Sequence, residues 1–189
     1  MRNIWILFLI IFGCSKPQKT IPNIAILIDS EQLTKKNDIV YYKNQLFNGH
    51  LIEKNIGGKL IAKSGYFNGK LEGLQQKWFE DGSKKEVRFY KNNLKVGKHE
   101  GWYQNGNKRF EYLIEKDIPI GVHREWFENG QPFSLFSYNN LGQPEGLQKM
   151  WFENGQTKAN YVVKNGRRYG LLGAKGCQGM QERKTTKLP

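Results

Sequence analysis

Glycine pairs recur along most of this chain at a nearly constant interval. In each pair a closing glycine follows an opening glycine by nine residues, and successive pairs lie 24 or 25 residues apart. A period of about 20 to 50 residues is typical of repeat architectures, in which each copy folds into one small unit that stacks on its neighbours. We expect all twelve to be turn glycines of such a repeat. The opening glycines are Gly49, Gly73, Gly97, Gly121, Gly146 and Gly170, and the closing glycines are Gly58, Gly82, Gly106, Gly130, Gly155 and Gly179.

Turn-forming residues accompany the closing glycines. Asp or Asn precedes four of them, and these dipeptides favour type I′ hairpin turns, in which both central residues have positive φ. A second column of residues that tolerate positive φ lies between the copies. The sequence therefore predicts a meander of alternating turns and strands. The residues before the closing glycines are Asp81, Asn105, Asn129 and Asn154, and the second column is Gly69, Asn93, Asp117, Gly142 and Gly166.

An adjacent pair of aromatic residues lies between the two glycines of four copies. These repeat aromatics are Trp78 and Phe79, Trp102 and Tyr103, Trp126 and Phe127, and Trp151 and Phe152. Successive side chains of a strand project to opposite faces, so Trp126 and Phe127 are expected on opposite faces of a sheet. One hairpin is too small to be stable alone, and the copies are expected to share a core along one axis. The prediction is an all-β fold, an elongated and twisted antiparallel array of β-hairpins.

These motifs resemble the bacterial MORN-variant repeat proteins, whose pattern is Gly, four residues, Trp, an aromatic residue, one residue, Asn and Gly. The pattern is matched at residues 73–82, 97–106, 121–130 and 146–155. The end copies have Lys54 and Asn55, or Lys175 and Gly176, in place of the aromatic pair, and polar outer ends are what a repeat array needs. The resemblance implies the fold but does not specify an activity.

The first 13 residues have the pattern of a signal peptide. Arg2 precedes a run of nine apolar residues, which is shorter than the about 20 needed to span a bilayer. Residues 11–14 resemble a bacterial lipoprotein box, and this resemblance implies that Cys14 becomes the lipid-modified first residue of the mature chain. Residues 14–23 are then a lipid-anchored tether. We expect the protein in the cell envelope, facing the periplasm or on the outer membrane.

The remaining boundaries follow from composition. Residues 24–48 are expected to form N-terminal capping strands, with a loop at residues 35–38 between two apolar runs. Residues 49–180 are assigned to MORN-like β-hairpin repeats without an internal boundary. Residues 181–189 are charged and poor in apolar side chains, which indicates a disordered basic tail.

The charge balance points to acidic partners. The formal net charge is +13 at pH 7, and a basic surface attracts anionic lipid, acidic polysaccharide, nucleic acid or acidic proteins. Nucleic acid is excluded because an exported protein rarely meets it and no nucleic-acid motif is present. Alternatively, lysines only blunt exposed sheet edges against aggregation. The fixed register of the aromatic residues favours core packing over base stacking.

Metal and redox chemistry have little support in the sequence, and we expect no cofactor. With Cys14 lipidated, Cys177 is an odd thiol that, together with Met180, offers soft ligands for Cu(I). His99 and His123 occupy the same column, but equivalent strands lie about 9.5 Å apart, which is long for a shared zinc ion. We therefore expect two solvent-facing imidazoles.

Catalytic motifs are absent from the sequence, and glutamates beside the turns recur in register like cross-strand partners of lysine. We expect no enzyme activity. The favoured function is an envelope-anchored β-repeat scaffold that binds a protein partner or an acidic surface polymer. The alternatives are an antitoxin or immunity protein of a toxin–antitoxin pair, which the family resemblance implies, an anionic-lipid binder, and a copper or redox accessory protein acting through Cys177 and Met180.

Overall fold

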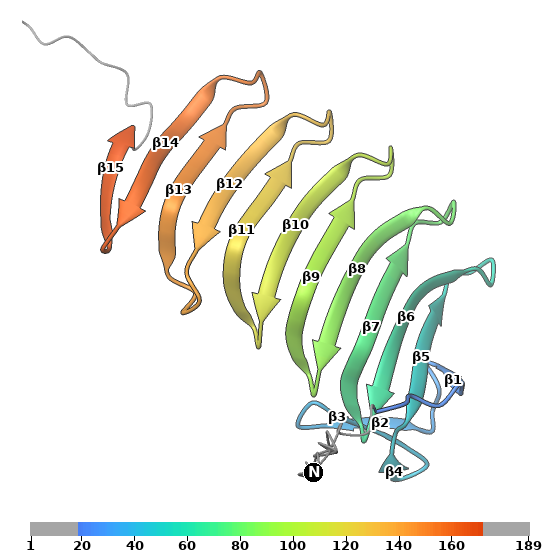
Figure 1. Ribbon diagram of the computed structural model, residues 1–189. Coiled ribbons are helices and arrows are strands. Elements are labelled where there is room, and N and C mark those ends of the chain that lie inside the picture. Colours follow the sequence, from blue (N-terminus) through green and yellow to red (C-terminus); the bar gives the residue numbers. More distant parts are fainter. Residues whose placement is uncertain (1–18, 172–189) are drawn as a thin grey trace, which may run out of the picture.

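The computed structural model describes residues 19–171, and this part of the chain contains strands and no helix. Twelve strands form one long sheet in the order β1-β5-β6-β7-β8-β9-β10-β11-β12-β13-β14-β15, and β2, β3 and β4 form a small second sheet (Figure 1). The predicted all-β array of antiparallel hairpins is confirmed. The strands are β1 Ala25–Leu27, β2 Leu33–Lys36, β3 Ile39–Tyr42, β4 Gln45–Leu46, β5 Gly49–Lys54, β6 Leu60–Phe67, β7 Lys70–Trp78, β8 Lys84–Lys91, β9 Leu94–Trp102, β10 Lys108–Glu115, β11 Ile118–Trp126, β12 Pro132–Tyr138, β13 Pro144–Trp151, β14 Thr157–Lys164 and β15 Arg167–Leu171.

Within the described residues, the closing glycines from Gly58 to Gly155 end three-residue loops rather than type I′ turns. In one copy the Gly130 N–H donates to Phe127 O at 2.9 Å, and the Phe127 N–H donates to Gln131 O at 2.8 Å. Gly130 has φ +85°, but Asn129 is not among the residues with positive φ. The Asn129 Oδ1 instead accepts a hydrogen bond from the Gln131 N–H at 2.9 Å. The type I′ prediction for this column is therefore wrong, because Asn and Asp are used here for a side-chain turn bond and only the glycine needs positive φ.

The type I′ turns lie in the second column, between the copies. Lys116 and Asp117 have φ of +50° and +66°, and Asn92 and Asn93 have +51° and +71°. The exception is Gly142, where the Gly142 N–H donates to Asn139 O at 3.0 Å in a three-residue loop like those at the closing glycines. The single 25-residue step of the repeat is thus one residue inserted into a turn, which leaves the strands in register.

The opening glycines lie within strands, not in turns. Gly73, Gly97 and Gly121 have φ of +72°, +74° and +65° at points where β7, β9 and β11 carry extra residues relative to the neighbouring strand. Such β-bulges bend a strand and increase its twist. The prediction that these are turn glycines is therefore wrong, and their regular spacing produces a regularly curved sheet (Figure 1).

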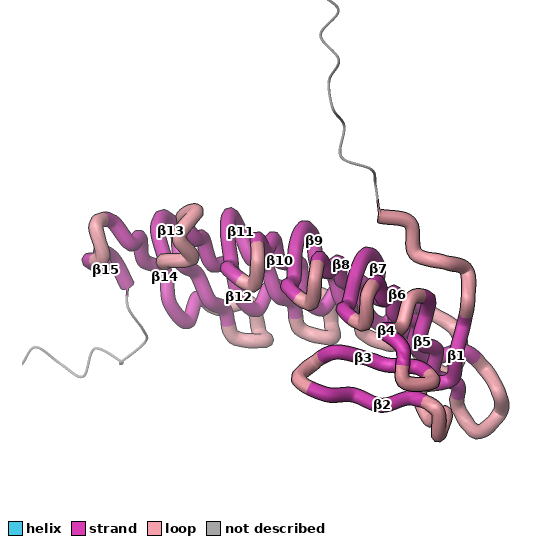
Figure 2. Tube along the Cα trace, turned by 90° about the horizontal axis from the view of Figure 1, so that it is seen from below, coloured by secondary structure: helices cyan, strands magenta, loops and turns pink. Residues whose placement is uncertain are grey.

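A small cap covers the N-terminal end of the array. Strand β1 pairs in parallel with β5, and the hairpins of β2, β3 and β4 fold to one side of the repeat row (Figure 2). The expected loop at residues 35–38 is shorter, because β2 extends to Lys36 and only Asn37 and Asp38 form the turn. The best-buried hydrophobic cluster lies between this cap and the first strands of the array and consists of Val40, Phe47 and Leu51, with Ile26, Leu33, Tyr42 and Tyr66 packed around it.

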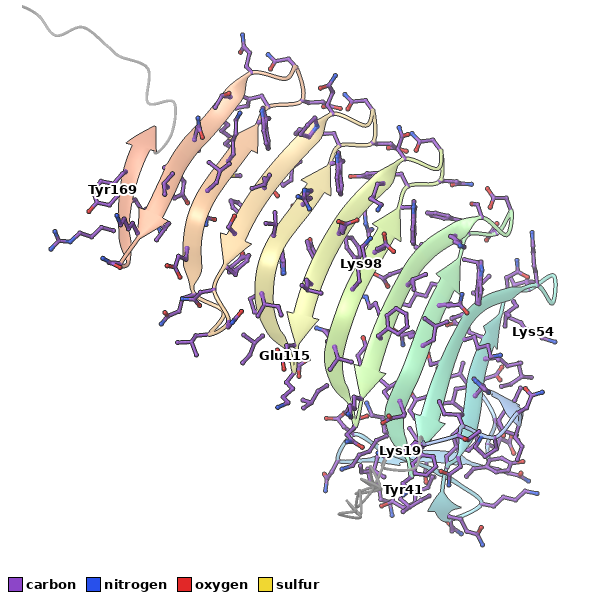
Figure 3. All side chains as sticks on the ribbon, viewed as in Figure 1. Lys19, Tyr41, Lys54, Lys98, Glu115 and Tyr169 are labelled. Carbon is purple, nitrogen blue, oxygen red and sulfur yellow. The ribbon has the colours of Figure 1, made fainter. Side chains whose placement is uncertain are left out.

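The two faces of the repeat sheet differ in burial. The buried residues of β8–β14 all lie on the face that carries Phe110, which we call the inner face. No second layer of described strands covers β9–β14 (Figures 1 and 3), so this burial comes from neighbouring side chains that pack against one another on the same face of the sheet. The buried residues are Glu86, His99, Gly101, Phe110, Ser134, Gln148, Ala159 and Val163.

Candidate functional site

The repeat aromatics lie at the ends of the long strands. Each Trp is the last residue of its strand, and the second aromatic opens the closing loop. That second ring packs against the return strand: the Phe127 and Phe133 ring centroids are 5.1 Å apart, and the Lys158 Nζ lies 5.6 Å from the Phe152 centroid. The second aromatic residue of each of these two pairs therefore stabilises its own hairpin by packing.

The histidine column is structural. His99 is fully buried, and its Nε2 lies 3.1 Å from Phe89 O, while the His123 Nε2 lies 2.8 Å from Leu113 O. In the same column Gln148 donates through its Nε2 to Ser137 O at 2.8 Å. The expectation of solvent-facing imidazoles is therefore wrong. These side chains bond carbonyl groups beside the bulges, where the strand ladder is interrupted.

Burial keeps these imidazoles neutral. It is the main cause that lowers the pKa of His99 and His123 below the ordinary value, and hydrogen bonds to backbone carbonyls oppose it only in part. A carbonyl oxygen only accepts, so the contacts place a proton on Nε2, and the lowered pKa favours the neutral ring that carries its one proton there.

An open groove crosses the inner face from β8 to β12. Its volume is about 520 Å³, and six of its nine lining side chains are aromatic. The strands beneath it are fully paired with their neighbours, so the groove lies over the middle of the sheet and not at an edge. We call it the inner groove, and it is lined by Arg88, Tyr103, Arg109, Phe110, Tyr112, Glu125, Trp126, Phe127 and Phe133.

A cluster of cations occupies the β8 end of the inner groove. The Glu86 carboxylate lies 2.5 Å from Arg88, 3.6 Å from Arg109 and 3.8 Å from Lys77. Burial raises the pKa of Glu86. The hydrogen bond from Arg88 and the three nearby positive charges lower it by more than burial raises it, so the pKa lies below its ordinary value. Three cations around one carboxylate leave this end with an excess of two positive charges.

The aromatic floor is held by the same arginines. The guanidinium carbons of Arg88 and Arg109 lie 5.5 Å and 5.1 Å from the centroid of the Phe110 ring, within the range of cation–π attraction. This ring covers Gly101, where an added Cβ would lie 2.3 Å from the ring. Tyr112 stacks beside Phe110 with a centroid separation of 4.7 Å.

A second carboxylate lies toward the β12 end. Glu125 accepts hydrogen bonds from the Tyr112 hydroxyl and, at 3.2 Å, from the Ser134 Oγ. Burial, followed by the bond to Glu125, raises the pKa of Tyr112 well above its ordinary value, so its hydroxyl remains a donor. The inner groove is therefore cationic at one end and anionic at the other.

The outer face carries a different pattern. Glu100 and Glu111 lie directly opposite each other across β9 and β10, and Lys98 and Lys108 bridge them at 2.8 to 3.0 Å. Beside this network, a row of apolar side chains crosses the sheet and is 36% to 43% exposed. It comprises Leu74, Phe89, Leu113, Val122, Leu147 and Val162.

Sequence reasoning missed the charged residues of the inner groove. In the 24-residue columns, the position of Glu86 is filled elsewhere by Ala62, Phe110, Ser134 and Ala159, and the position of Glu125 by Glu53, Lys77, Gly101 and Met150. Glu86 departs from its column, which was a signal for a local role, whereas Glu125 shares its residue type with Glu53 and gave no such signal.

Several predicted site residues lie outside the described residues. These are Cys14, Cys177, Met180 and Gly179, so the lipidation and copper hypotheses stay predictions. Within residues 19–171, no three His, Cys, Asp or Glu side chains are close enough together to hold a metal ion. The same part of the chain has no helix with the length and apolar character needed to cross a membrane.

Three segments of the chain match the family model of the MORN repeat variant, at residues 71–92, 119–140 and 144–165. They cover the β7–β8, β11–β12 and β13–β14 hairpins. The β9–β10 hairpin, which supplies Phe110 and Tyr112 to the inner groove, lies between the first two matched segments.

Other comparisons are weaker. No curated protein matches the chain at a significant level. A crystal structure of a point mutant of S. aureus TarM with fondaparinux, alpha-GlcNAc-glycerol and UDP is 11% identical, with a TM-score of 0.32 over 52% of this chain and 20% of that chain. A second TarM structure is 12% identical, with a TM-score of 0.31 over 53% and 20%. The chain spans about a fifth of the TarM length, and scores this low do not define a shared fold.

Proposed function

We propose that this protein is a non-catalytic MORN-type scaffold, anchored in the cell envelope through Cys14, that binds a partner on the inner face of its sheet. The observation that carries the proposal is the inner groove, in which aromatic and charged side chains lie open over the middle of a curved sheet. Binding sites combine apolar lining with a few oriented polar groups in this way. Glu86 and Glu125 are held by cations and hydroxyl groups, which suits fixed recognition groups.

The binding test uses the repeat as its own control. The purified protein is immobilised and incubated with envelope extract, and bound material is analysed for proteins and for sugar polymers. Trp126 lines the inner groove, whereas Trp78 has the same column position outside it. We expect Trp126→Ala to reduce recovery of a specific partner and Trp78→Ala to leave it unchanged. Recovery at background level, or equal loss in both variants, contradicts the proposal.

The anchor is tested separately. Mass spectrometry of the mature protein from a bacterial host is expected to show a lipid-modified Cys14 as the first residue, and Cys14→Ser is expected to abolish the modification. A mature chain that retains Met1 contradicts the anchor, but leaves partner binding on the inner face unaffected.

A second candidate function, anionic-lipid binding, is favoured by the outer face. The apolar row from Leu74 to Val162 is only half covered, and the protein has a formal net charge of +13. Half-exposed apolar side chains beside basic residues suit the interface of an anionic membrane. Liposome flotation tests it with protein that lacks residues 1–14. Equal flotation with anionic and neutral vesicles, or none with either, dismisses this function.

A further inference from the structure

We propose that the inner groove binds an acidic saccharide, with the anionic group at Arg109, a sugar ring on the aromatic floor and sugar hydroxyls at Glu125. The inference rests on the proposed function and names the partner chemistry of the same site. It concerns the stretch from β8 to β12 alone, not the whole inner face.

The β8 end has spare capacity for an anion. Glu86 has an almost covered side chain, whereas the side chains of Arg109 and Lys77 are 42% and 46% exposed. A guanidinium has five N–H donors, and the single carboxylate of Glu86 cannot accept those of both arginines. An incoming carboxylate or sulfate would therefore find donors that are already positioned, and planar Arg groups match such anions well.

The floor offers flat apolar surfaces at the spacing of a polymer. Tyr103 and Phe127 are half-buried and occupy equivalent positions in two neighbouring hairpins, about 9.5 Å apart, whereas Phe110 is buried and supports the floor without being exposed itself. The C–H face of a sugar ring stacks on an aromatic face, and a disaccharide unit has a length close to this spacing. The groove is open and crosses the strands, so a chain longer than the site can extend from either end.

The β12 end supplies an acceptor for hydroxyl groups. Glu125 receives two hydrogen bonds, from Tyr112 and Ser134. An ionised carboxylate has about four lone-pair sites, so Glu125 keeps acceptor capacity for a ligand. Sugar hydroxyls are donors of the required kind, and a second anionic group at this end would be repelled.

A peptide is a poorer occupant of this groove. Extended peptides gain much of their affinity by adding to a free strand edge. Strands β8 to β12 are paired on both sides, so the inner groove exposes no such edge. A peptide would have to leave its own backbone groups unpaired or hydrated, whereas a saccharide presents hydroxyl groups that suit Arg and Glu side chains directly.

The experiment compares one saccharide with its carboxylate free and with that carboxylate methyl-esterified. A disaccharide with a single uronic acid unit and the methyl ester of that disaccharide are titrated into the full chain, with tryptophan fluorescence and calorimetry as readouts. We expect the acid to bind, the ester to bind at least tenfold more weakly, and the affinity for the acid to fall with salt. Hexaglutamate is the peptide probe, and its binding as tight as the acid would overturn the saccharide assignment in favour of an acidic peptide.

Matched variants locate the site. Arg109 and Arg124 are 42% and 43% exposed, and each lies 3.6 Å from one glutamate, but only Arg109 lines the inner groove. We expect Arg109→Gln to weaken binding about tenfold, since a lost charge-assisted hydrogen bond costs about that much. Arg124→Gln is expected to leave it unchanged, and equal effects contradict the assignment.

A second pair of variants tests the aromatic floor. Phe127→Leu is expected to weaken binding, whereas Phe152→Leu, in the same column but outside the inner groove, is not. Thermal melts verify that all four variants are folded. If no saccharide binds while Trp126 still controls partner recovery from envelope extract, this inference fails and the proposed function stands. If neither is observed, both fail.

Discussion

At the scale of single residues, the glycines in the strand bulges and the glycines that close the hairpins share a positive φ. Gly97 has φ +74° in the middle of β9, and an added Cβ would meet nothing within 4 Å. A side chain at this position would therefore not collide with any neighbour, and the positive φ of the backbone is the reason that the position requires glycine. The same position in the other copies is also glycine, which makes the bulge a property of the repeat.

Replacing Gly97 by Ala isolates this conformational cost. We expect the free energy of unfolding to fall by about 1 to 2 kcal/mol, because an L-residue in the left-handed region is strained. Gly97→Asn is expected to cost less, since Asn tolerates positive φ. Urea unfolding measures both values, and an Ala variant as stable as the parent would show that the bulge is absent in solution.

His99, which is buried, and His123, which is half-buried, predict a pH dependence. Their pKa is lowered in the folded protein, so the unfolded chain takes up protons first as the pH falls through its ordinary value near 6.5. The contribution of these histidines to the free energy of unfolding is therefore expected to be fully present above that pH and to be lost as the pH falls below it. Carboxylates with lowered pKa, such as Glu86, contribute to a later loss near and below their ordinary value of 4.5.

The repeat supplies the control for this prediction. Gln148 makes the equivalent carbonyl bond in the same column, so the double variant His99→Gln with His123→Gln is expected to remain folded. Urea midpoints between pH 7.5 and pH 5 should then decline much less than in the parent. An unchanged decline assigns the effect to other groups.

At the scale of elements, the type I′ turns connect neighbouring hairpins. The Asp117 N–H donates to Lys95 O at 3.0 Å, and the Asp117 Oδ1 accepts from the Lys95 N–H at 2.9 Å. Asn93 makes the same two contacts with Leu71, at 2.9 Å and 2.6 Å. In these two turns, one residue thus closes the strand ladder of the preceding copy.

Three substitutions at Asp117 separate its roles. Asp117→Asn keeps the acceptor and is expected to change stability by only a few tenths of a kcal/mol. Asp117→Gly keeps the positive φ and loses the side-chain bond, at about 1 kcal/mol. Asp117→Ala loses both and is expected to cost the most. Chemical unfolding ranks them, and a neutral Gly variant contradicts the bridging role.

The hairpins were predictable from sequence, whereas the type of each turn, the bulges and the charged residues of the inner groove were not. The interval between Gly121 and Gly146 identified copies and strands, but it could not distinguish a turn from a bulge, because both place glycine at positive φ. Asn129 shows the same ambiguity, since Asn serves left-handed turns and side-chain turn bonds equally. Glu125 was missed because each bulge interrupts the alternation of side chains between the two faces. Which residues share a face with Glu125 is therefore known only after the bulges are located.

At the scale of the whole molecule, the sheet is an open array in which each hairpin pairs only with its neighbours. Twelve strands at about 4.8 Å give a length of about 50 Å. Figure 1 shows the N-terminal cap at one end and β15 at the other. Both faces of the middle hairpins are therefore available, and the inner groove lies where no described layer covers it.

Distances between turn tips test this open array most directly. Glu80, Glu128 and Glu153 are exposed, equivalent positions in three closing loops. With Cys14 and Cys177 replaced by Ser, spin labels at these positions are measured in pairs by electron double resonance. We predict about 19 Å for 80–128 and about 29 Å for 80–153, after allowance for the label, because the pairs are four and six strands apart. Distances that do not increase with the number of intervening copies would show a closed or compact fold and contradict the account.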